Sequence, residues 1–286
     1  MYKLLNADFY RLIKNKIFWG LIIITLCMAC FFLKNLEFYG DSIELLITNL
    51  FGTIGFFISL FTTLFVGLEY ANGAIRNKIV VGHSRIKIYL SDLIISITVG
   101  IIIELAYILF ILVVGNVILD EAQFVLPIAQ FFKMLLHIVT IIIMYSTIFN
   151  CITLLCNDIT VSTVICIIFV FIMFLSDGTL SMIVHSEKYN YQYTYNEDGE
   201  ETREIIGPNP NYPGETKKQI AKVLRNFTPI GHTNQVNEVV GEQISQIMMN
   251  YKGEIPNTTN LLWYSLGTII LINTTGIYLF DKKELK

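Results

Sequence analysis

The sequence has 286 residues, of which 54% are hydrophobic and only 15% are charged, and its formal net charge is −3. A soluble domain carries about 25% charged residues, so this composition argues against a soluble protein and for a chain that lies largely in lipid. The weak negative charge gives no basic surface of the kind that binds nucleic acid. The five cysteines all lie in apolar stretches, which excludes a disulfide framework.

Residues 1–16 are expected to form an amphipathic helix that lies in the membrane interface. The apolar residues recur at helical spacing, and the polar ones fall mainly on the opposite face. The helix is either a basic anchor that sets topology or a lever that couples a soluble partner to the first span. The apolar positions are Tyr2, Leu5, Phe9, Leu12 and Ile13, and the polar ones are Lys3, Asn6, Arg11 and Lys14.

Six later segments are apolar over the length of about 20 residues that a membrane-spanning helix needs. All six prolines fall outside them, which supports their boundaries. The predicted fold is therefore an all-α membrane protein, with five spans in residues 17–184 and a sixth span and tail in residues 261–286. The segments are Ile17–Leu33, Leu50–Leu68, Leu93–Leu119, Met134–Cys156, Val161–Val184 and Leu261–Phe280.

The short basic stretches set the orientation of these spans, because loops rich in lysine and arginine stay in the cytoplasm. The stretches on the opposite side offer only Lys34 and Lys133. We therefore expect both termini in the cytoplasm and residues 185–260, the outer segment, on the other side of the cell membrane. The basic residues on the cytoplasmic side are Lys3, Arg11, Lys14, Lys16, Arg76, Lys78, Arg85, Lys87, Lys282, Lys283 and Lys286.

The loop between the second and third spans is longer than a connection requires. A plain helix–helix connection takes about two to eight residues, whereas this one runs from Glu69 to Tyr89. Its apolar residues predict one face of a short helix, and Ser84 is placed to cap the third span. The alternative is a basic anchor without a helix. The apolar face comprises Tyr70, Ala71, Ala74, Ile75 and Ile79, and the polar face comprises Asn72, Gly73, Arg76 and Asn77.

Several polar residues lie inside the predicted spans, where an ionisable side chain costs at least about 2.5–3.5 kcal/mol. Glu104, near the middle of the third span, should face the bundle or a polar partner. The group is either a translocation path or ion site, or a set of side chains protonated or hydrogen-bonded between helices. Its members are Glu104, His137, Asn150, Asp177 and Asn273.

The outer segment is predicted to hold a hairpin and two amphipathic helices. The four alternating tyrosines form one face of a strand, Asn196–Gly199 forms a turn, and Thr202–Ile206 returns. The tyrosine face either packs on the helices as a small core or recognises a substrate or partner. The tyrosines are Tyr189, Tyr191, Tyr193 and Tyr195; the helices are marked by Ile220, Val223, Leu224 and Phe227, and by Val236, Val239, Val240, Ile247 and Met248, with Pro229 and Gly231 between them.

The sequence contains no motif for catalysis or cofactor binding. It has no G-x-x-x-x-G-K-[ST] phosphate loop, no H-E-x-x-H and no G-x-S-x-G. The four histidines are scattered and form no metal-ligand spacing with the cysteines. The chain is therefore expected to be no enzyme and to bind no cofactor or metal, which leaves a transporter subunit, a channel or a membrane-embedded binding protein.

The pattern E-x-x-N-G-x-I-R-N-K-x-x-x-G-x-S-R-x-x-x-Y, from Glu69 to Tyr89, resembles the permease subunits of ABC-2 type exporters. The layout of basic N-terminal helix, six spans and large outer segment is similar too, although the motif covers only this loop. The two outer helices resemble the capping helices of that family, whereas the tyrosine hairpin departs from its smaller members.

The resemblance implies a bacterial permease that exports a peptide, bacteriocin or drug. A separate ATP-binding subunit would hold ATP and magnesium, and a second permease chain, identical or different, would complete the pore. The loop would hold the coupling helix that docks on the ATPase. Residues that would form or support this contact are Glu69, Asn72, Gly73, Arg76, Asn77, Lys78 and Arg85.

Two other classes of protein remain open. An ion-coupled carrier or channel predicts repeats and spans interrupted by glycine or proline, yet no predicted span contains proline. A sensor or immunity protein that sequesters a peptide with its outer segment predicts binding without ATP-driven movement.

Overall fold

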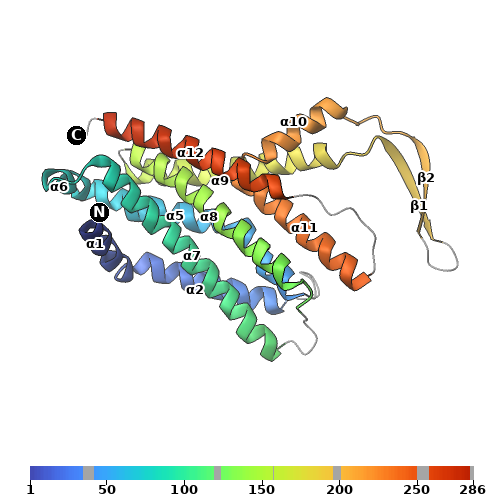
Figure 1. The fold of residues 1–286 in the computed structure, drawn as a ribbon, viewed down its shortest axis with the longest axis horizontal. Helices are drawn as coiled ribbons and strands as arrows, with labels where there is room; N and C mark the ends of the chain where they lie inside the picture. Colours follow the sequence, from blue (N-terminus) through green and yellow to red (C-terminus); the bar gives the residue numbers. More distant parts are fainter. Residues whose placement is uncertain (35–41, 119–123, 157, 196–200, 250–257, 284–286) are drawn as a thin grey trace.

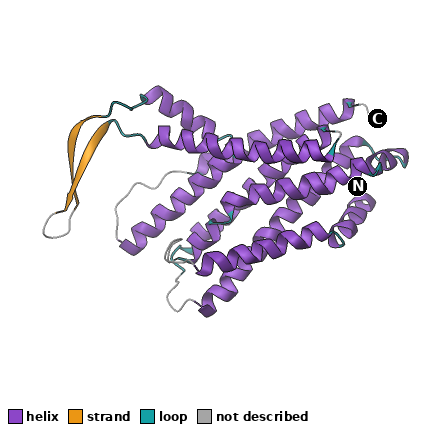
Figure 2. Cartoon of the chain, turned by 180° about the vertical axis from the view of Figure 1, so that it is seen from behind, coloured by secondary structure: helices purple, strands orange, loops and turns teal. Residues whose placement is uncertain are grey.

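The computed structural model describes residues 1–34, 42–118, 124–156, 158–195, 201–249 and 258–283. These residues form a bundle of helices and one two-stranded sheet that extends from it (Figures 1 and 2). Within them, six helices are long and apolar enough to cross a membrane. The chain is a multi-pass membrane protein, and the predicted number of spans is confirmed.

The six spans contain the segments expected from the sequence. They are built by α2 (Lys16–Lys34), α4 (Ile43–Thr48) with α5 (Phe51–Ala71), α7 (Arg85–Ile118), α8 (Ile128–Leu155), α9 (Ile159–His185) and α12 (Thr259–Lys282). The second span is longer than predicted because α4 extends it to Ile43–Ala71. Glu44, expected in an outer loop, lies in α4, and its Oε1 accepts hydrogen bonds from the backbone N–H groups of Val125 and Leu126.

Helices α5 and α8 form the centre of the bundle, and their spans are the most buried of the six. They approach closely where Gly55 faces Tyr145, since a Cβ on Gly55 would lie 2.7 Å from the tyrosine ring. Small residues at such crossings let helix backbones pack tightly in membranes. The buried Thr153 hydroxyl donates within its own helix to the carbonyl oxygen of Phe149 at 2.7 Å, whereas that of Thr62 in α5 donates to Ser96 Oγ of α7 at 3.1 Å.

Helix α1 (Tyr2–Ile13) is present as predicted, but it packs with a different face. Leu4, Asp8 and Leu12 are buried, while Tyr2 and Ile13, assigned to the same apolar face as Leu12, are exposed. The cause is Asp8, which is held by Lys78 and Ser91 from distant parts of the chain. Hydrophobic periodicity alone does not detect such partners.

Helix α6 (Ala74–Val80) confirms the short helix expected between the second and third spans. Gly73 and Gly82, with φ of 66° and 98°, turn the chain into and out of it. Such left-handed conformations favour glycine. Ile75 is buried beneath the helix, whereas Arg76 and Asn77 are exposed on the other face. Within α6 the predicted division between the two faces is correct, whereas Tyr70 and Ala71, predicted on the same apolar face, belong to the end of α5, and Ala71 is exposed. Ser84 directly precedes α7, and its carbonyl oxygen accepts from Ile88.

The outer segment contains the predicted hairpin and two helices. Strands β1 (Tyr189–Tyr195) and β2 (Glu201–Pro208) are antiparallel, with Tyr191 paired to Ile205. The turn predicted at Asn196–Gly199 lies outside the described residues. The hairpin extends beyond the helices (Figures 1 and 2), and Tyr189 and Tyr191 on its first strand are half-buried.

Helices α10 (Glu215–Arg225) and α11 (Pro229–Met249) confirm the two predicted outer helices. Val236, Val239 and Val240 of α11 are buried as the pattern indicates, whereas Ile247 and Met248, marked by the same pattern, are exposed. In helix α10 the face that is buried is opposite to the predicted one, because the apolar residues Ile220 and Leu224 are exposed. Its buried residues are Ala221 and Arg225. The apolar face of α10 is thus directed away from the bundle, and a charged residue faces inward.

Candidate functional site

The strongest concentration of buried charge lies at the basic end of the bundle, formed by α1, α6 and the C-terminal turn of α12 (Figure 1). We refer to Asp8, Arg11, Glu69, Lys78 and Asp92 as the buried ion cluster. The ammonium of Lys78 is 3.1 Å from Asp8 Oδ1, 2.6 Å from Glu69 Oε1 and 3.8 Å from Asp92 Oδ1. Lys78 on the short helix α6 is thereby tied to three other helices at once.

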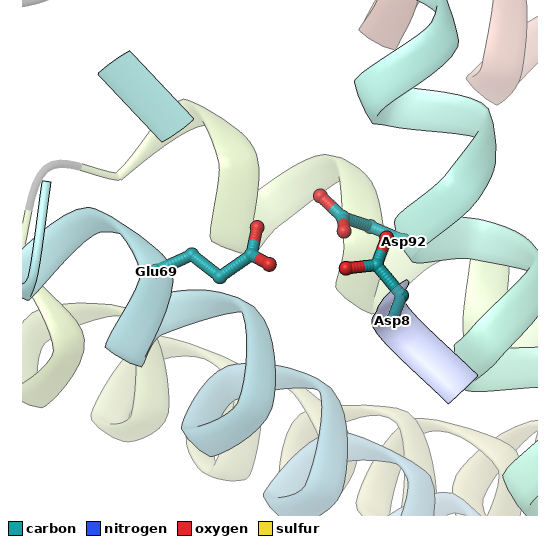
Figure 3. Close-up of side chains that lie close together, drawn as sticks. All are labelled: Asp8, Glu69 and Asp92. Carbon is teal, nitrogen blue, oxygen red and sulfur yellow. The ribbon is translucent and has the colours of Figure 1, made fainter. Parts of the chain in front are cut away.

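Three carboxylates point toward one another in this cluster (Figure 3). Their oxygens lie within 4.8 Å of one another, a spacing that could hold a metal ion. Lys78 already supplies positive charge among them. Burial disfavours its charged form, but Asp92, Glu69 and Asp8 outweigh this effect, so the pKa of Lys78 is raised above its ordinary value. The lysine therefore stays charged throughout the physiological pH range.

Arg11 and Ser91 complete the cluster. Arg11 Nη1 donates to Glu69 Oε1, and its guanidinium lies 3.9 Å from the centre of the Phe65 ring. Ser91 Oγ donates to Asp8 Oδ2 at 2.7 Å. Neither oxygen of Asp92 has a hydrogen-bond partner among the described residues. Three acids thus share two cations, and Lys78 is the cation within salt-bridge distance of Asp92 among the described residues.

The exposed side of α6 differs from the buried cluster beneath it. Arg76 and Asn77 are exposed, and Val80 and Val81 are 79% and 78% exposed. Sequence reasoning did not single out the two valines. The available signal is an apolar pair directly before a glycine in an otherwise basic loop. The exposed tip of α6 therefore combines apolar and basic side chains, as a protein-docking surface does.

Arg85 has a different place from the other predicted coupling residues. Its Nη1 donates to the carbonyl oxygens of Phe280 at 3.0 Å and Asp281 at 2.9 Å, and also to that of Lys283. Lys283 Nζ in turn donates to the carbonyl oxygens of Leu154 at 2.7 Å and Cys156 at 3.0 Å. These contacts, which we call the carboxyl-end clasp, join the ends of α7, α8 and α12. Burial lowers the pKa of Lys283 to about 8.

The structure divides the predicted coupling residues into three groups. Glu69 and Lys78 meet inside the buried ion cluster, and Arg85 lies in the carboxyl-end clasp. The remaining ones form the surface and turn of the α6 region: Asn72, Gly73, Arg76 and Asn77. The side chains able to touch a partner are thus fewer than the sequence pattern indicates.

The residues predicted to line a translocation path do not come together. Asn150 Nδ2 donates to the carbonyl oxygen of Tyr89 at 3.2 Å, and the Tyr89 hydroxyl donates to Asn273 Oδ1 at 3.1 Å, so these three join α7, α8 and α12. Glu104 is buried in α7, and neither carboxylate oxygen has a hydrogen-bond partner in the described part of the chain. His137 lines a small cavity of about 30 Å³ between α8 and α11.

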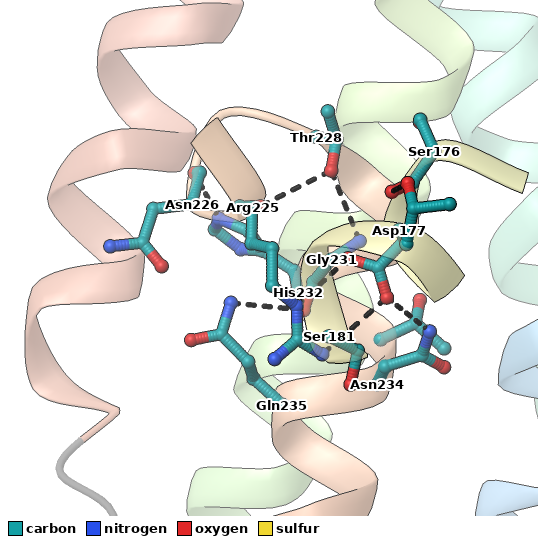
Figure 4. A network of polar contacts seen from close by, with 12 residues as sticks. Ser176, Asp177, Ser181, Arg225, Asn226, Thr228, Gly231, His232, Asn234 and Gln235 are labelled. Carbon is teal, nitrogen blue, oxygen red and sulfur yellow. Dashed lines mark hydrogen bonds and ion pairs between the residues drawn. The ribbon is translucent and has the colours of Figure 1, made fainter. Parts of the chain in front are cut away.

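Asp177 belongs to a separate outer network (Figure 4). Arg225 of α10 donates from Nε to Asp177 Oδ1 at 2.9 Å and from Nη2 to Glu238 Oε1 at 3.0 Å. Asn234 Nδ2 donates to Asp177 Oδ2 at 2.6 Å. Burial works against the charge on Arg225, but Asp177 and Glu238 outweigh it and raise its pKa above the ordinary value. The network links α9, α10 and α11.

The first turn of α11 requires glycine at position 231, where it packs against the end of α10. A Cβ there would lie 2.2 Å from the carbonyl oxygen of Arg225 and 2.7 Å from Thr228 Oγ1. We expect Gly231→Ala to lower the free energy of unfolding by about 1–3 kcal/mol, because this backbone must move and distort the outer network. Thermal unfolding of the purified protein in detergent measures the effect.

Gly241 provides the matched control for this change. It lies in the same helix α11, and nothing is within 4 Å of a Cβ built on it. Gly241→Ala should leave stability unchanged or raise it by up to about 1 kcal/mol, because alanine favours a helix. Equal effects of the two substitutions would show that the close approach at Gly231 is unimportant.

A wide pocket of about 580 Å³ opens beside the outer network between α9 and α11. Six of its eight lining residues are polar, among them His185, whose Nε2 lies 3.6 Å from Glu238 Oε2. The lining residues are Asp177, Gly178, Ser181, Met182, His185, Asn234, Asn237 and Glu238. Tyr189 and Tyr191 of β1 are not among these lining residues.

Comparison of the sequence with models of known protein families gives no match, and comparison with curated proteins gives none either.

Proposed function

We propose that this chain is the membrane-spanning subunit of an exporter that is driven by a separate ATP-hydrolysing subunit, as in ABC-2 type permeases. The observation that carries the proposal is α6, a seven-residue helix whose outer face is exposed and whose inner face is tied into the buried ion cluster. An isolated helix of this length is unstable in water. The bundle therefore maintains it as a presented surface.

The tip of α6 suits a protein partner. Val80 and Val81 are exposed, and they lie outside the apolar spans. Arg76 adds a positive charge next to this apolar pair. A groove on a soluble subunit that buried both valines would gain about 1.5–3 kcal/mol for each. The two valines and Arg76 are the residues that we assign to contact with the partner.

The buried ion cluster gives the contact a mechanical consequence. Because Lys78 binds carboxylates of α1, α5 and α7, a displacement of α6 acts on all three helices. α5 is one of the two central helices. ATP and magnesium would be held by the partner, whose hydrolysis cycle would move α6 and, through it, the spans.

In this proposal the α1 and α6 end is cytoplasmic and the outer segment lies outside the cell membrane. A second permease chain completes the pathway, and the cargo is an amphipathic or hydrophobic molecule such as a peptide, bacteriocin or drug. The basic loops support this orientation.

The test is recruitment of a candidate ATPase subunit to the purified protein in lipid nanodiscs. Val80→Asp combined with Val81→Asp should reduce recruitment of the ATPase at least tenfold, because two charges replace the apolar contact. It should also abolish the increase in ATP hydrolysis that the wild-type protein in nanodiscs causes in the ATPase. The matched control is Ile205→Asp with Ile206→Asp, an exposed apolar pair on the hairpin at the far end of the molecule. If the wild type recruits no ATPase, or if both pairs act alike, the proposal fails.

An ion-coupled carrier is a second candidate, and Glu104 is the observation that favours it. This acid is 3% exposed within α7, and its oxygens lack hydrogen-bond partners among the described residues. A carrier would move substrate into liposomes under a proton gradient without any ATPase, and Glu104→Gln would abolish that movement. A non-transporting sensor or immunity protein would bind peptide and show neither activity.

A further inference from the structure

Helix α10 presents an apolar stripe to the surface of the protein. Its four members recur at helical spacing, and each is between 44% and 56% exposed. Ala221 and Arg225, which face the bundle, lie on another side of the helix. A contiguous apolar surface of this kind marks contact with lipid or with another protein. The members of this surface, which we call the α10 stripe, are Ile220, Val223, Leu224 and, two residues after the helix, Phe227.

The contacts of α10 fix its depth beside the span α9. Near its start, Lys218 Nζ donates to the carbonyl oxygen of Ser186, which directly follows α9. Near its end, Arg225 Nε donates to Asp177 Oδ1 at 2.9 Å. Asp177 lies eight residues before the end of α9 at His185, which is about 12 Å along an α-helix. Helix α10 therefore runs back along the last turns of a membrane span (Figure 1).

The start of α12 marks the membrane–water interface at the level of the α10 stripe. The ring of Phe227 packs edge-on against that of Tyr264, with 5.1 Å between the ring centres. Trp263, the neighbour of Tyr264, is 73% exposed. Both aromatic residues lie near the start of the span Thr259–Lys282. Because tryptophan and tyrosine are enriched where a span leaves the lipid, the end of α10 lies at the depth where lipid begins.

The remaining surface of α10 is polar. Lys222 is exposed, and because it lies two residues before Leu224, the two side chains point to nearly opposite sides of the helix. Gln219 is exposed on the same side as Lys222. On α9, the large side chains exposed on either side of Asp177 are apolar, namely Leu175 and Met182. An amphipathic helix at this depth lies with its apolar side among the lipid tails and its polar side toward water.

We propose that the α10 stripe is embedded in the lipid leaflet nearest the hairpin, with the acyl chains as its partner and Lys222 on the side of the headgroups and water. Part of the outer segment then lies within the membrane surface, beside α9 and α12. The inference needs only that these two helices span a membrane, so it does not rest on the proposed export function. A second copy of the chain is the competing occupant, and the interfacial position of Trp263 next to the stripe favours lipid.

The rate at which a charged, water-soluble thiol reagent modifies an introduced cysteine tests the proposal. The full chain with Leu224→Cys or Lys222→Cys is placed in nanodiscs that hold one copy each, and mass spectrometry of the surrounding peptide measures the modification. The five native cysteines lie outside residues 185–260 and do not interfere. We expect Leu224→Cys to react at least about tenfold more slowly than Lys222→Cys, because the apolar part of a bilayer excludes a charged reagent. Both positions are exposed, so folding stays intact, as the melting temperature verifies.

Ile206→Cys is the control for an exposed apolar position, since Ile206 is 67% exposed on the hairpin that extends beyond the helices. It should react as fast as Lys222→Cys. Equal rates at positions 222 and 224 would overturn the proposal, because the α10 stripe would then lie in water. Protection of position 224 only in nanodiscs that hold two copies would overturn it in favour of a second copy of the chain. Slow modification at all three positions would overturn it too, because the protection would not belong to the stripe.

Discussion

Replacing Lys78 with methionine should lower the free energy of unfolding by about 3–5 kcal/mol, the cost of removing one partner from a buried ion pair. The lysine side chain is only 14% exposed, and its ammonium is the nearest cation to both Asp8 and Asp92. Without it, three buried carboxylates from three helices are left with Arg11 alone. Thermal unfolding in detergent should show a fall in melting temperature on the order of 10 °C.

Arg76→Met is the control for this change, because Arg76 lies on the exposed face of the same helix. It should alter stability by less than about 0.5 kcal/mol. Adding Asp92→Asn to Lys78→Met should recover part of the lost stability, since it removes one of the uncompensated charges. If the double variant is no more stable than Lys78→Met, the charge balance of the cluster is not what Lys78 maintains.

Replacing Arg225 with methionine should destabilise the outer part of the molecule by a similar amount, about 3–5 kcal/mol. The Arg225 side chain is 3% exposed and is the cation that compensates Asp177, whose side chain is 1% exposed. Hydrogen exchange should rise first in α10 and in the first turns of α11, because Arg225 joins these helices to α9. Hydrogen exchange followed by mass spectrometry resolves this local effect from global unfolding.

Lys222→Met controls for the loss of a positive charge from α10, since Lys222 is exposed one turn before Arg225. It should leave exchange in α11 unchanged. The double variant Arg225→Met with Asp177→Leu should be more stable than Arg225→Met alone, because replacing both members of a buried pair removes the unpaired charge. The opposite order of stability would show that Asp177 is compensated by another group.

The spans could be predicted from sequence because apolar length decides them almost alone. The hairpin was also predictable, since alternating tyrosines and a turn sequence are local signals, and its strands match the expected ones. The face of each helix was less predictable where a charge is buried. Asp8 and Arg225 occupy positions that periodicity assigns to water, because their partners come from 70 and 48 residues away, in Lys78 and Asp177.

The candidate site shows the same division. The motif between Glu69 and Tyr89 predicted a short helix in this loop, and α6 lies there. It did not separate Lys78, which points into the bundle, from Arg76, which points out of it. Residues two apart on a helix lie on different faces. Whether each face is buried depends on the helices that pack against it. That information resides in α1, α5 and α7, whose arrangement no single segment encodes.

The carboxyl-end clasp has a consequence for the order in which the protein is made. Ribosomes synthesise α5, α7 and α8 before α12. The hydrogen bonds from Arg85 to the carbonyl oxygens of Phe280 and Asp281 therefore form only after α12 has been inserted. Until then the carbonyl oxygen of Cys156 also lacks Lys283, while that of Leu154 already accepts from the Tyr70 hydroxyl of α5. An unpaired carbonyl at a helix end needs another partner such as water. A nascent chain that stalls before α12 would therefore lack the carboxyl-end clasp and be more accessible to membrane proteases at these helix ends. In the finished bundle, insertion of α12 completes the clasp as a late step.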